Sequence, residues 1–380
     1  MSTVTLADAE ARKEDYLALL KRFVEIESPT RDEAANLEVA DALEAELSEL
    51  GGVVARIPAP GLGVHLLARF DSETQPGGEP ILVIGHMDTV HAKGTLSRLP
   101  FEVEGDRVRG PGVYDMKGGV SAALLALRML GERGVRPALP IHFLISCDEE
   151  IGSPTSRERI EAEAKRARAT LVLEPSIPGG FAKTQRKGVG GYTLTVSGVA
   201  AHAGIEPEAG ASAVHELALQ VGRILALAAP ENGTTLNIGV MSGGTKENVV
   251  AEEATCTIDL RFWNRAEAER VDEGLKALAP SDARCALALE GGINRFALEK
   301  TPESALLYEA AERKAHALGF ALGEGKSGGG SDGNLTAAVG CPTLDGLGPD
   351  GGGAHALTEH ILVEDIPRRV ALMAALFEGM

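Results

Sequence analysis

Residues 81–85 read ILVIG, residues 117–134 read KGGVSAALLALRMLGERG, and residues 141–146 read IHFLIS. The first and last of these segments are short, almost wholly apolar runs, which are typical of strands buried on both faces of a sheet. The segment between them carries an apolar helix pattern that ends at glycine. A strand, a crossover helix and a second strand form the unit from which parallel sheets are built. The stretch therefore predicts an α/β fold.

The same alternation extends in both directions along the chain. Further apolar runs predict strands at residues 64–70 and 171–173, and helical patterns cover residues 6–25, 31–50 and 153–167. After residue 302 the chain returns to helix, glycine-rich loop, short strand and helix. We therefore expect a mixed, mostly parallel sheet between layers of helices.

From residue 187 onward the pattern changes. Residues 189–199 alternate between apolar and polar positions, as in a strand with one face exposed to solvent. The predicted order is strand, helix, two strands, helix and strand, at residues 189–199, 211–228, 235–243, 249–263, 265–279 and 284–292. That order is the one of a ferredoxin-like unit. We therefore expect a smaller α+β domain, residues 187–294, inserted into an α/β domain made of residues 1–186 and 295–380.

Composition excludes several classes of partner. The 380 residues include 37 basic and 55 acidic side chains, and the net charge of −18 disfavours nucleic acid or an anionic membrane as a partner. No segment resembles a membrane span of about 20 apolar residues. The polar N-terminus shows no signal peptide, and the four cysteines lie far apart without a CxxC pair. These features predict a protein of the reducing cytoplasm without a cysteine-based zinc site.

Acidic residues and one histidine follow the predicted strands at the points where each strand ends. They are His86 and Asp88 after 81–85, Glu149 and Glu150 after 141–146, Glu174 after 171–173, and Asp115 before the helix at 117–134. Ligands of open α/β sheets bind beyond the carboxyl ends of the strands. Imidazole with several carboxylates and no thiolate favours Zn²⁺, Mn²⁺ or Co²⁺ over Mg²⁺. Because so many carboxylates repel one another, we expect two metal ions that share one carboxylate and activate a water.

Several blocks in this sequence resemble a known family. The first four are GHMDTV (85–90), GVYDMKGG (112–119), DEEIGS (148–153) and LEPS (173–176), and the later ones are RKGVGGYTLTVSGVAAHAG (186–204), GGTKENVV (243–250), GGGSDG (328–333) and GGAH (352–355). Together they resemble the co-catalytic dizinc metallopeptidases, a family of glutamate carboxypeptidases, aminoacylases, acetylornithine deacetylases and succinyl-diaminopimelate desuccinylases. The later blocks and DIPRRV (365–370) are most similar to glutamate carboxypeptidases. The resemblance implies a catalytic domain of the zinc-exopeptidase kind and an inserted dimerisation or lid domain.

The resemblance also implies roles for the strand-end residues. Two zinc ions, which Co²⁺ or Mn²⁺ can replace, would share Asp115, with His86 and Glu174 completing one ligand set and Glu150 and His355 completing the other. Glu149 would be the general base. Asp88 stands two residues after His86 and is placed to accept the other ring N–H of that histidine.

For the inserted domain the resemblance implies contacts to substrate and to a second subunit. His202 would reach across the interface of a homodimer and stabilise the oxyanion in the partner's site. Asn248 and Arg261 would bind the substrate, Arg261 through the α-carboxylate, because a planar guanidinium fits two oxygens. Gly329 and Gly330 would let the backbone approach the substrate closely.

These features together predict a hydrolase that cleaves an amide bond next to a free carboxylate. The substrate class is a small peptide or an N-acyl amino acid, and the resemblance implies, as our first expectation, an exopeptidase that releases C-terminal glutamate from peptides or N-acyl glutamates. The alternative is an N-acyl-amino-acid deacylase of the aminoacylase or acetylornithine deacetylase type. A catalytically silent binding homologue is disfavoured, because all five expected ligands and Glu149 are present.

Other motifs favour plainer interpretations. Residues 323–333 contain Gly-Lys-Ser, but a phosphate-binding loop needs glycine where Phe320 stands. No G-x-S-x-G elbow of a serine hydrolase is present. We expect His91 and His360 at the surface, and an ion pair with Asp259 is the simpler role for Arg261.

Overall fold

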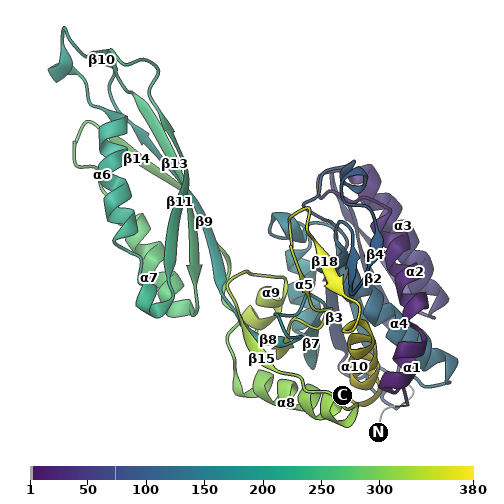
Figure 1. Ribbon diagram of the computed structural model, residues 1–380. Coiled ribbons are helices and arrows are strands. Elements are labelled where there is room, and N and C mark those ends of the chain that lie inside the picture. The colour runs from purple at the N-terminus through teal and green to yellow at the C-terminus, as the bar shows by residue number, and fades with distance from the viewer. Residues whose placement is uncertain (1–2, 73) are drawn as a thin grey trace. The chain divides into compact units, whose positions relative to one another are not determined.

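The computed structural model describes residues 3–72 and 74–380, which divide into two compact units. The first unit comprises the residues up to Gln185 together with Lys300–Ser327 and Ser331–Met380, and the second comprises Arg186–Glu299 and Gly328–Gly330. Figure 1 labels most of the helices and strands of both units. Each unit has its own hydrophobic core, so each is described separately.

A six-stranded mixed sheet forms the centre of the first unit. Its order is β1 (Val53–Ala59), β2 (Gly63–Phe70), β6 (Ile141–Ser146), β3 (Ile81–His86), β7 (Ala169–Val172) and β16 (Thr343–Leu344). The strands from β6 to β16 run parallel, whereas β1 and β2 pair antiparallel at one edge. The predicted α/β fold with a mixed, mostly parallel sheet is therefore confirmed.

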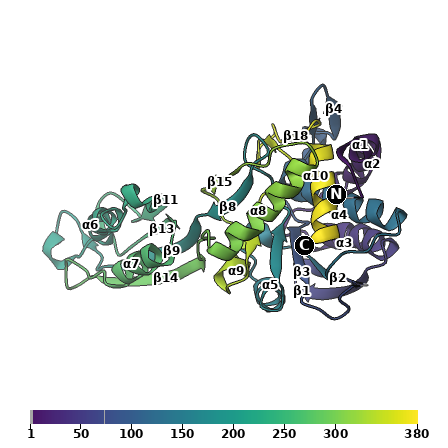
Figure 2. The same cartoon turned by 90° about the horizontal axis from the view of Figure 1, so that it is seen from below.

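Helices cover both faces of this sheet, which explains why its strands are continuously apolar. The helices are α1 (Leu6–Ala11), α2 (Lys13–Val24), α3 (Glu33–Glu49), α4 (Gly118–Glu132), α5 (Arg157–Ala164), α8 (Pro302–Ala317), α9 (Gly333–Ala338) and α10 (Ile366–Gly379). Val83 packs in the larger core with α4 and α10, and Leu82 packs in the smaller core with α5 and α9. Figure 2 shows α10 between α4 and α8.

Gly119 in the first turn of α4 brings the helix against the loop after β7. A Cβ atom at this position would lie 1.9 Å from the carbonyl oxygen of Leu173. Two backbone segments thus approach so closely that no side chain fits between them. The approach brings the start of α4, which follows the Asp115 turn, against the loop after β7, which carries Glu174.

Replacing Gly119 with alanine is expected to destabilise the protein by about 1–3 kcal/mol or more, because the backbone must move to admit the methyl group. Gly131→Ala in the same helix is the matched control, since nothing lies within 4 Å of a Cβ atom there. The control should be neutral or stabilising by up to about 1 kcal/mol. Urea unfolding measures both variants, and a Gly119→Ala midpoint equal to the parent's contradicts the expectation.

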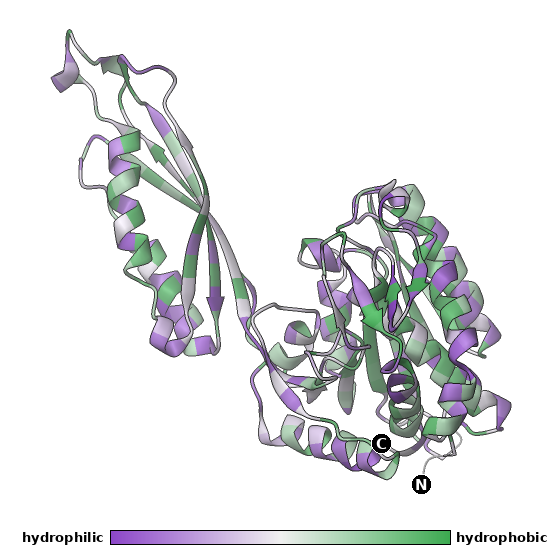
Figure 3. Cartoon of the chain, in the orientation of Figure 1, coloured by the Kyte–Doolittle hydropathy of each residue, from purple (hydrophilic) through white to green (hydrophobic). Residues whose placement is uncertain are grey.

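The second unit contains an antiparallel sheet and two helices. Its sheet order is β11 (Thr235–Gly243), β13 (Glu253–Phe262), β9 (Gly188–Ser197) and β14 (Ala286–Arg295). The helices α6 (Ala213–Leu225) and α7 (Arg265–Lys276) lie on one face of it (Figure 1). Residues along β13 alternate between buried and exposed, and Figure 3 shows the matching alternation of hydropathy. The chain order of these elements is the predicted β-α-β-β-α-β.

Several short elements were not predicted from the sequence. In the second unit β10 (Ala201–His202) pairs with β12 (Val249–Val250) in a small ribbon, so the predicted strand 249–263 is interrupted before β13. In the first unit a small sheet contains β17 (Gly351–Gly352), β18 (His360–Leu362), β5 (Arg107–Arg109) and β4 (Glu102–Glu104), and β15 (Glu324–Ser327) pairs with β8 (Ala182–Arg186). The predicted helix 6–25 is two helices, because Arg12 leaves the helical conformation between them.

Two expectations from composition concern the cysteines and membrane-spanning segments. All four cysteines are buried and carry free thiols. Among the described residues, no helix is both long and apolar enough to cross a membrane.

Candidate metal centre

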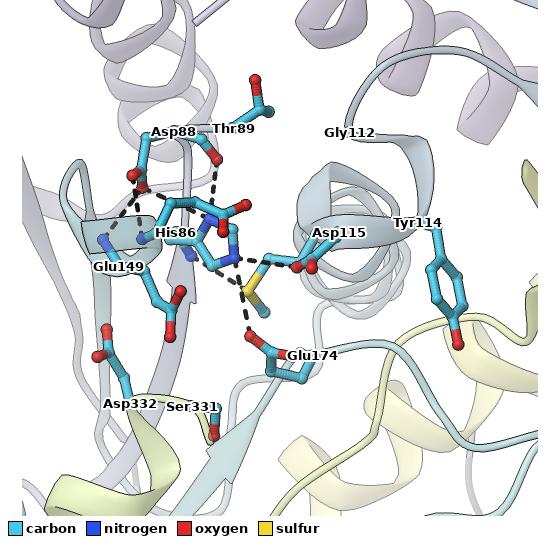
Figure 4. Close-up of polar contacts among 12 residues, drawn as sticks. His86, Asp88, Thr89, Gly112, Tyr114, Asp115, Glu149, Glu174, Ser331 and Asp332 are labelled. Carbon is cyan, nitrogen blue, oxygen red and sulfur yellow. Dashed lines mark hydrogen bonds and ion pairs between the residues drawn. The ribbon is translucent and has the colours of Figure 1, made fainter. Parts of the chain in front are cut away.

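Five of the predicted site residues lie at one edge of the central sheet, and Figure 4 labels four of them, His86, Asp115, Glu149 and Glu174. His86 is the last residue of β3, and Glu174 follows shortly after β7. Glu149 and Glu150 begin a single helical turn, Glu149–Ile151, after β6. Asp115 lies in the turn Val113–Lys117 that leads into α4. The parallel strands therefore bring these side chains together at their carboxyl ends.

Asp115 stands between two histidines. Its Oδ1 atom lies 3.1 Å from Nε2 of His86, and its Oδ2 atom lies 3.4 Å from Nε2 of His355. The Nε2 atom of His86 is also 3.7 Å from Oε1 of Glu174, and that of His355 is 3.4 Å from Oε2 of Glu150. Each oxygen of Asp115 thus faces a different imidazole–carboxylate pair, as a shared ligand would.

The donor atoms fit divalent cations. Ligand atoms of His86, Glu149 and Glu174 lie within 4.8 Å of one another, as do those of His86, Asp115 and Glu150. The Oε1 atom of Glu150 is buried and has no hydrogen-bond partner among the described residues. A buried carboxylate oxygen without a donor is costly, and a cation would compensate it. Nitrogen and oxygen donors without sulfur suit Zn²⁺, Co²⁺ or Mn²⁺.

The same contacts shift the pKa values of the acid and the two histidines. Burial raises the pKa of Asp115, but hydrogen bonds with His355 and His86 outweigh burial and hold it well below its usual range. Burial lowers the pKa of His86, but hydrogen bonds to Asp115 and Asp88 raise it well above its ordinary value. Hydrogen bonds to Asp115 and Glu150 raise the pKa of His355 to about 10. A divalent cation would displace these protons, so metal binding should weaken as the pH falls.

Asp88 connects the histidine to the acidic turn. Its carboxylate accepts the backbone N–H groups of Glu149 and Glu150, both at 3.3 Å, and the hydroxyl of Thr30 at 2.8 Å. The ring Nδ1 of His86 lies 2.9 Å from the backbone carbonyl oxygen of Asp88 and 3.5 Å from its Oδ1. Asp88 therefore orients the ring mainly through its main chain, whereas the sequence suggested its carboxylate.

The sequence profile of peptidase family M20/M25/M40 matches residues 82–379. The chain belongs to this family. Carboxypeptidase G2 of Pseudomonas sp. is 33% identical over 375 residues, 94% of this chain and 87% of that protein. A succinyl-diaminopimelate desuccinylase of Rhodospirillum rubrum is 29% identical over 308 residues, 75% of this chain and 76% of that protein.

Solved structures share the fold of this M20/M25/M40 peptidase. Aminopeptidase PepT of Bacillus cereus superposes with a TM-score of 0.76 at 24% identity, covering 96% of this chain and 98% of that one. The M20 family metallo-carboxypeptidase Sso-CP2 of Sulfolobus solfataricus has the same TM-score at 16% identity, with coverage of 96% and 98%. The resemblance to a metallopeptidase family is thus confirmed, and the protein is a hydrolytic enzyme.

Asp148 has a structural role in this peptidase. Its Oδ2 atom accepts the backbone N–H groups of Thr155 and Ser156 at 2.7 and 3.1 Å, and Oδ1 accepts the Ser156 hydroxyl at 2.6 Å. The carboxylate therefore closes the loop that carries Glu149 and Glu150. Asp148, Glu149 and Glu150 are consecutive acids, and the sequence alone does not indicate that Asp148 is the one that points away from the metal centre.

The M20/M25/M40 peptidase has a further buried acid that sequence reasoning missed. Glu359 accepts hydrogen bonds from the backbone of the Asp115 turn and lies 2.5 Å from Nε2 of His91. The expectation that His91 is a surface residue was wrong, because its side chain is 9% exposed. The one feature of the sequence that could have indicated a role for Glu359 is its position four residues after His355, a predicted metal ligand.

The predicted substrate residues of this peptidase occupy the second unit. His202 is exposed on β10, and its Nδ1 atom accepts the N–H of Gly204 at 3.1 Å. The carbonyl oxygen of Asn248 accepts the N–H of Ala203 at 3.0 Å, so the ribbon brings His202 and Asn248 close together. Arg261 forms the simpler of its two expected contacts, an ion pair with Asp259 at 3.0 Å.

Gly329 and Gly330 are held through their backbone. The carbonyl oxygen of each accepts a hydrogen bond from Nη1 of Arg186 at 3.2 Å. The Arg186 side chain is buried. These contacts order the glycine segment, and its role toward substrate stays a prediction.

Proposed function

We propose that this peptidase uses two divalent metal ions to hydrolyse an amide bond next to a free carboxylate, releasing C-terminal glutamate from peptides or N-acyl glutamates. The position of Asp115 carries the proposal, because its two oxygens face two separate imidazole–carboxylate pairs. The 33% identity to a carboxypeptidase supports the choice of bond.

The residues that would hold the metals are those already described. His86, Asp115 and Glu174 would bind one ion, and Asp115, Glu150 and His355 would bind the other, with Zn²⁺ as the first choice and Co²⁺ or Mn²⁺ as substitutes. Bound there, the ions would polarise the scissile carbonyl group and lower the pKa of water. The side chain of His355 is exposed, so this ligand is accessible from solvent.

Glu149 is the proposed general base. Its side chain is buried among the ligands, and Asp88 fixes its backbone N–H. The Glu149 carboxylate would take a proton from the attacking water and then donate it to the nitrogen of the departing amine. One buried carboxylate would thus serve both proton transfers.

The second unit would bind substrate and a second subunit. We propose that Arg261 exchanges Asp259 for the α-carboxylate of the substrate, that Asn248 donates to its carbonyl oxygen, and that His202 of a partner subunit stabilises the oxyanion. A homodimer is supported by exposed apolar residues on the edge strand β11 and on α6, namely Val240, Met241, Leu219 and Leu225. Free cysteines support a cytoplasmic location.

The runner-up is an N-acyl-amino-acid deacylase. The specific observation in its favour is the 29% identity to a succinyl-diaminopimelate desuccinylase. Both reactions hydrolyse an amide with the same metal ligands and base, so the difference lies in the side chain and acyl group that the enzyme accepts.

A substrate panel distinguishes the two functions. It should contain an N-acyl glutamate, the matching N-acyl glutamine, a peptide ending in glutamate, N-acetylornithine and an N-succinyl diamino acid. We expect the glutamate compounds to have the highest kcat/KM, with the glutamine analogue well below its match. Preference for the N-succinyl compound would favour the deacylase. No turnover of any of these compounds by protein that binds two metal ions would contradict both candidate functions.

A further inference from the structure

Glu359 is a buried carboxylate with four hydrogen-bond donors around it. Its Oε1 atom accepts the backbone N–H groups of Tyr114 at 2.9 Å and Asp115 at 3.0 Å. Its Oε2 atom accepts the N–H of Gly112 at 3.1 Å and lies 2.5 Å from Nε2 of His91. The side chain is 1% exposed, so these donors replace water entirely.

The donors come from loops that carry different metal ligands. Gly112, Tyr114 and Asp115 form the turn of the shared ligand, and His91 belongs to the loop that begins at His86. Glu359 itself lies in the loop of His355. One carboxylate therefore connects the loops of three of the five proposed ligands.

The arrangement requires a carboxylate. An ionised carboxylate offers acceptors on both oxygens, whereas an amide of the same shape has one acceptor and one donor group. With glutamine at position 359, one side of the group would place an N–H₂ against N–H donors of the Asp115 turn or against the His91 ring. The turn would then have to shift, and Asp115 would move with it.

A second contact holds the same turn. The hydroxyl of Tyr114 donates to the carbonyl oxygen of Ser176 at 2.9 Å, two residues beyond Glu174. The turn is thus attached to the Glu174 loop by a side chain and to the His355 and His86 loops through Glu359. Only the latter attachment contacts the backbone N–H of Asp115 itself.

We propose that Glu359 and His91 are positioning residues that hold the Asp115 carboxylate between the two metal ions. The proposal rests on the proposed two-metal function, but it concerns residues that are not metal ligands. His91 donates its Nε2–H to Glu359, which fixes the carboxylate against the turn. Loss of either residue would lower metal affinity and turnover without removing a ligand.

The test compares Glu359→Gln, His91→Leu and His91→Gln with the parent. Glutamine at position 91 places its Nε2 donor where the ring donor of histidine stands, whereas leucine has none. Glu216→Gln is the matched control, because Glu216 is also buried and accepts two backbone N–H groups, from Ser281 and Asp282. The readouts are Zn²⁺ affinity from competition with a chelating indicator, the unfolding midpoint in chelator, and kcat and KM for an N-acyl glutamate.

Of the two Zn²⁺ ions, one will be bound less tightly than the other in the parent. We expect Glu359→Gln and His91→Leu to bind that ion about 10- to 100-fold more weakly than the parent does, a range typical of residues that orient metal ligands. Their kcat should fall with little change in KM, and His91→Gln should recover most of the loss. Their unfolding midpoints in chelator should fall no further than that of the Glu216→Gln control, which also loses a buried carboxylate that accepts backbone N–H groups. The Glu216→Gln control should keep parental Zn²⁺ affinity.

Parental Zn²⁺ affinity in Glu359→Gln would overturn the proposal. If Glu359→Gln does not fold, the two His91 variants test the proposal instead. Equal Zn²⁺ affinities of His91→Leu and His91→Gln would then overturn it. The proposed function fails separately, if the parent itself binds fewer than two ions or does not hydrolyse the amide substrates.

Discussion

Glutamine in place of Glu149 should abolish most turnover while the protein keeps its fold and its metal ions. The substitution preserves the shape of the side chain but removes its ability to accept a proton from water. General acid–base catalysis of this kind contributes on the order of 10²- to 10⁴-fold, so we expect kcat to fall by that factor. Glu149 is buried beside the metal ligands, so glutamine of the same shape should leave those ligands in place. The loss of turnover would then come from the missing proton acceptor.

The measurement pairs kcat on an N-acyl glutamate with the metal content of each purified protein. Glu158→Gln is the control, because Glu158 is exposed in the first turn of α5 and should behave as the parent does. Activity of Glu149→Gln within tenfold of the parent would exclude Glu149 as the base. Loss of a metal ion instead would make it a ligand, a role that its proximity to His86 and Glu174 also permits.

The second large effect is expected for Asp115→Asn. Asparagine keeps the size of the side chain but leaves one oxygen to serve two metal positions, and its amide nitrogen is a poor ligand. Loss of metal-based charge stabilisation worth several kcal/mol corresponds to a fall in kcat of about 10³-fold or more. We expect at most one tightly bound ion per chain in this variant.

Metal analysis and steady-state kinetics check that expectation. Asp106→Asn is a suitable control, since Asp106 is an exposed residue of the same first unit. An Asp115→Asn protein that retains two ions and parental kcat would show that the two positions do not depend on a shared carboxylate.

Much of the metal centre could be predicted because the sequence marks where buried strands end. Continuous apolar runs located β3, β6 and β7, and the polar residues after them, such as His86 and Glu174, were therefore placed at one edge of the sheet. His355 could be assigned only by resemblance, because it lies in an irregular loop with no periodic pattern around it. The order of the second unit was predictable from a different pattern, because its strands alternate between buried and more exposed positions.

The remaining features depend on contacts between residues far apart in the chain. His91 and Glu359 are 268 positions apart, so their pairing has no local signal. Strands of two or three residues, such as β10 and β17, are too short to show a period of two. The Asp88 carboxylate likewise accepts hydrogen bonds from Thr30, Glu149 and Glu150, which lie far away in the chain, and the His86 ring contacts the Asp88 carbonyl oxygen instead.

The number of divalent ions bound per chain tests the paired metal centre most directly. Protein saturated with Zn²⁺, Co²⁺ or Mn²⁺ and freed of excess ion should contain two ions per chain. A chelator should remove them together with all amide hydrolysis, and adding the ion back should restore activity. Full activity in protein that binds one ion or none would contradict the shared-carboxylate site.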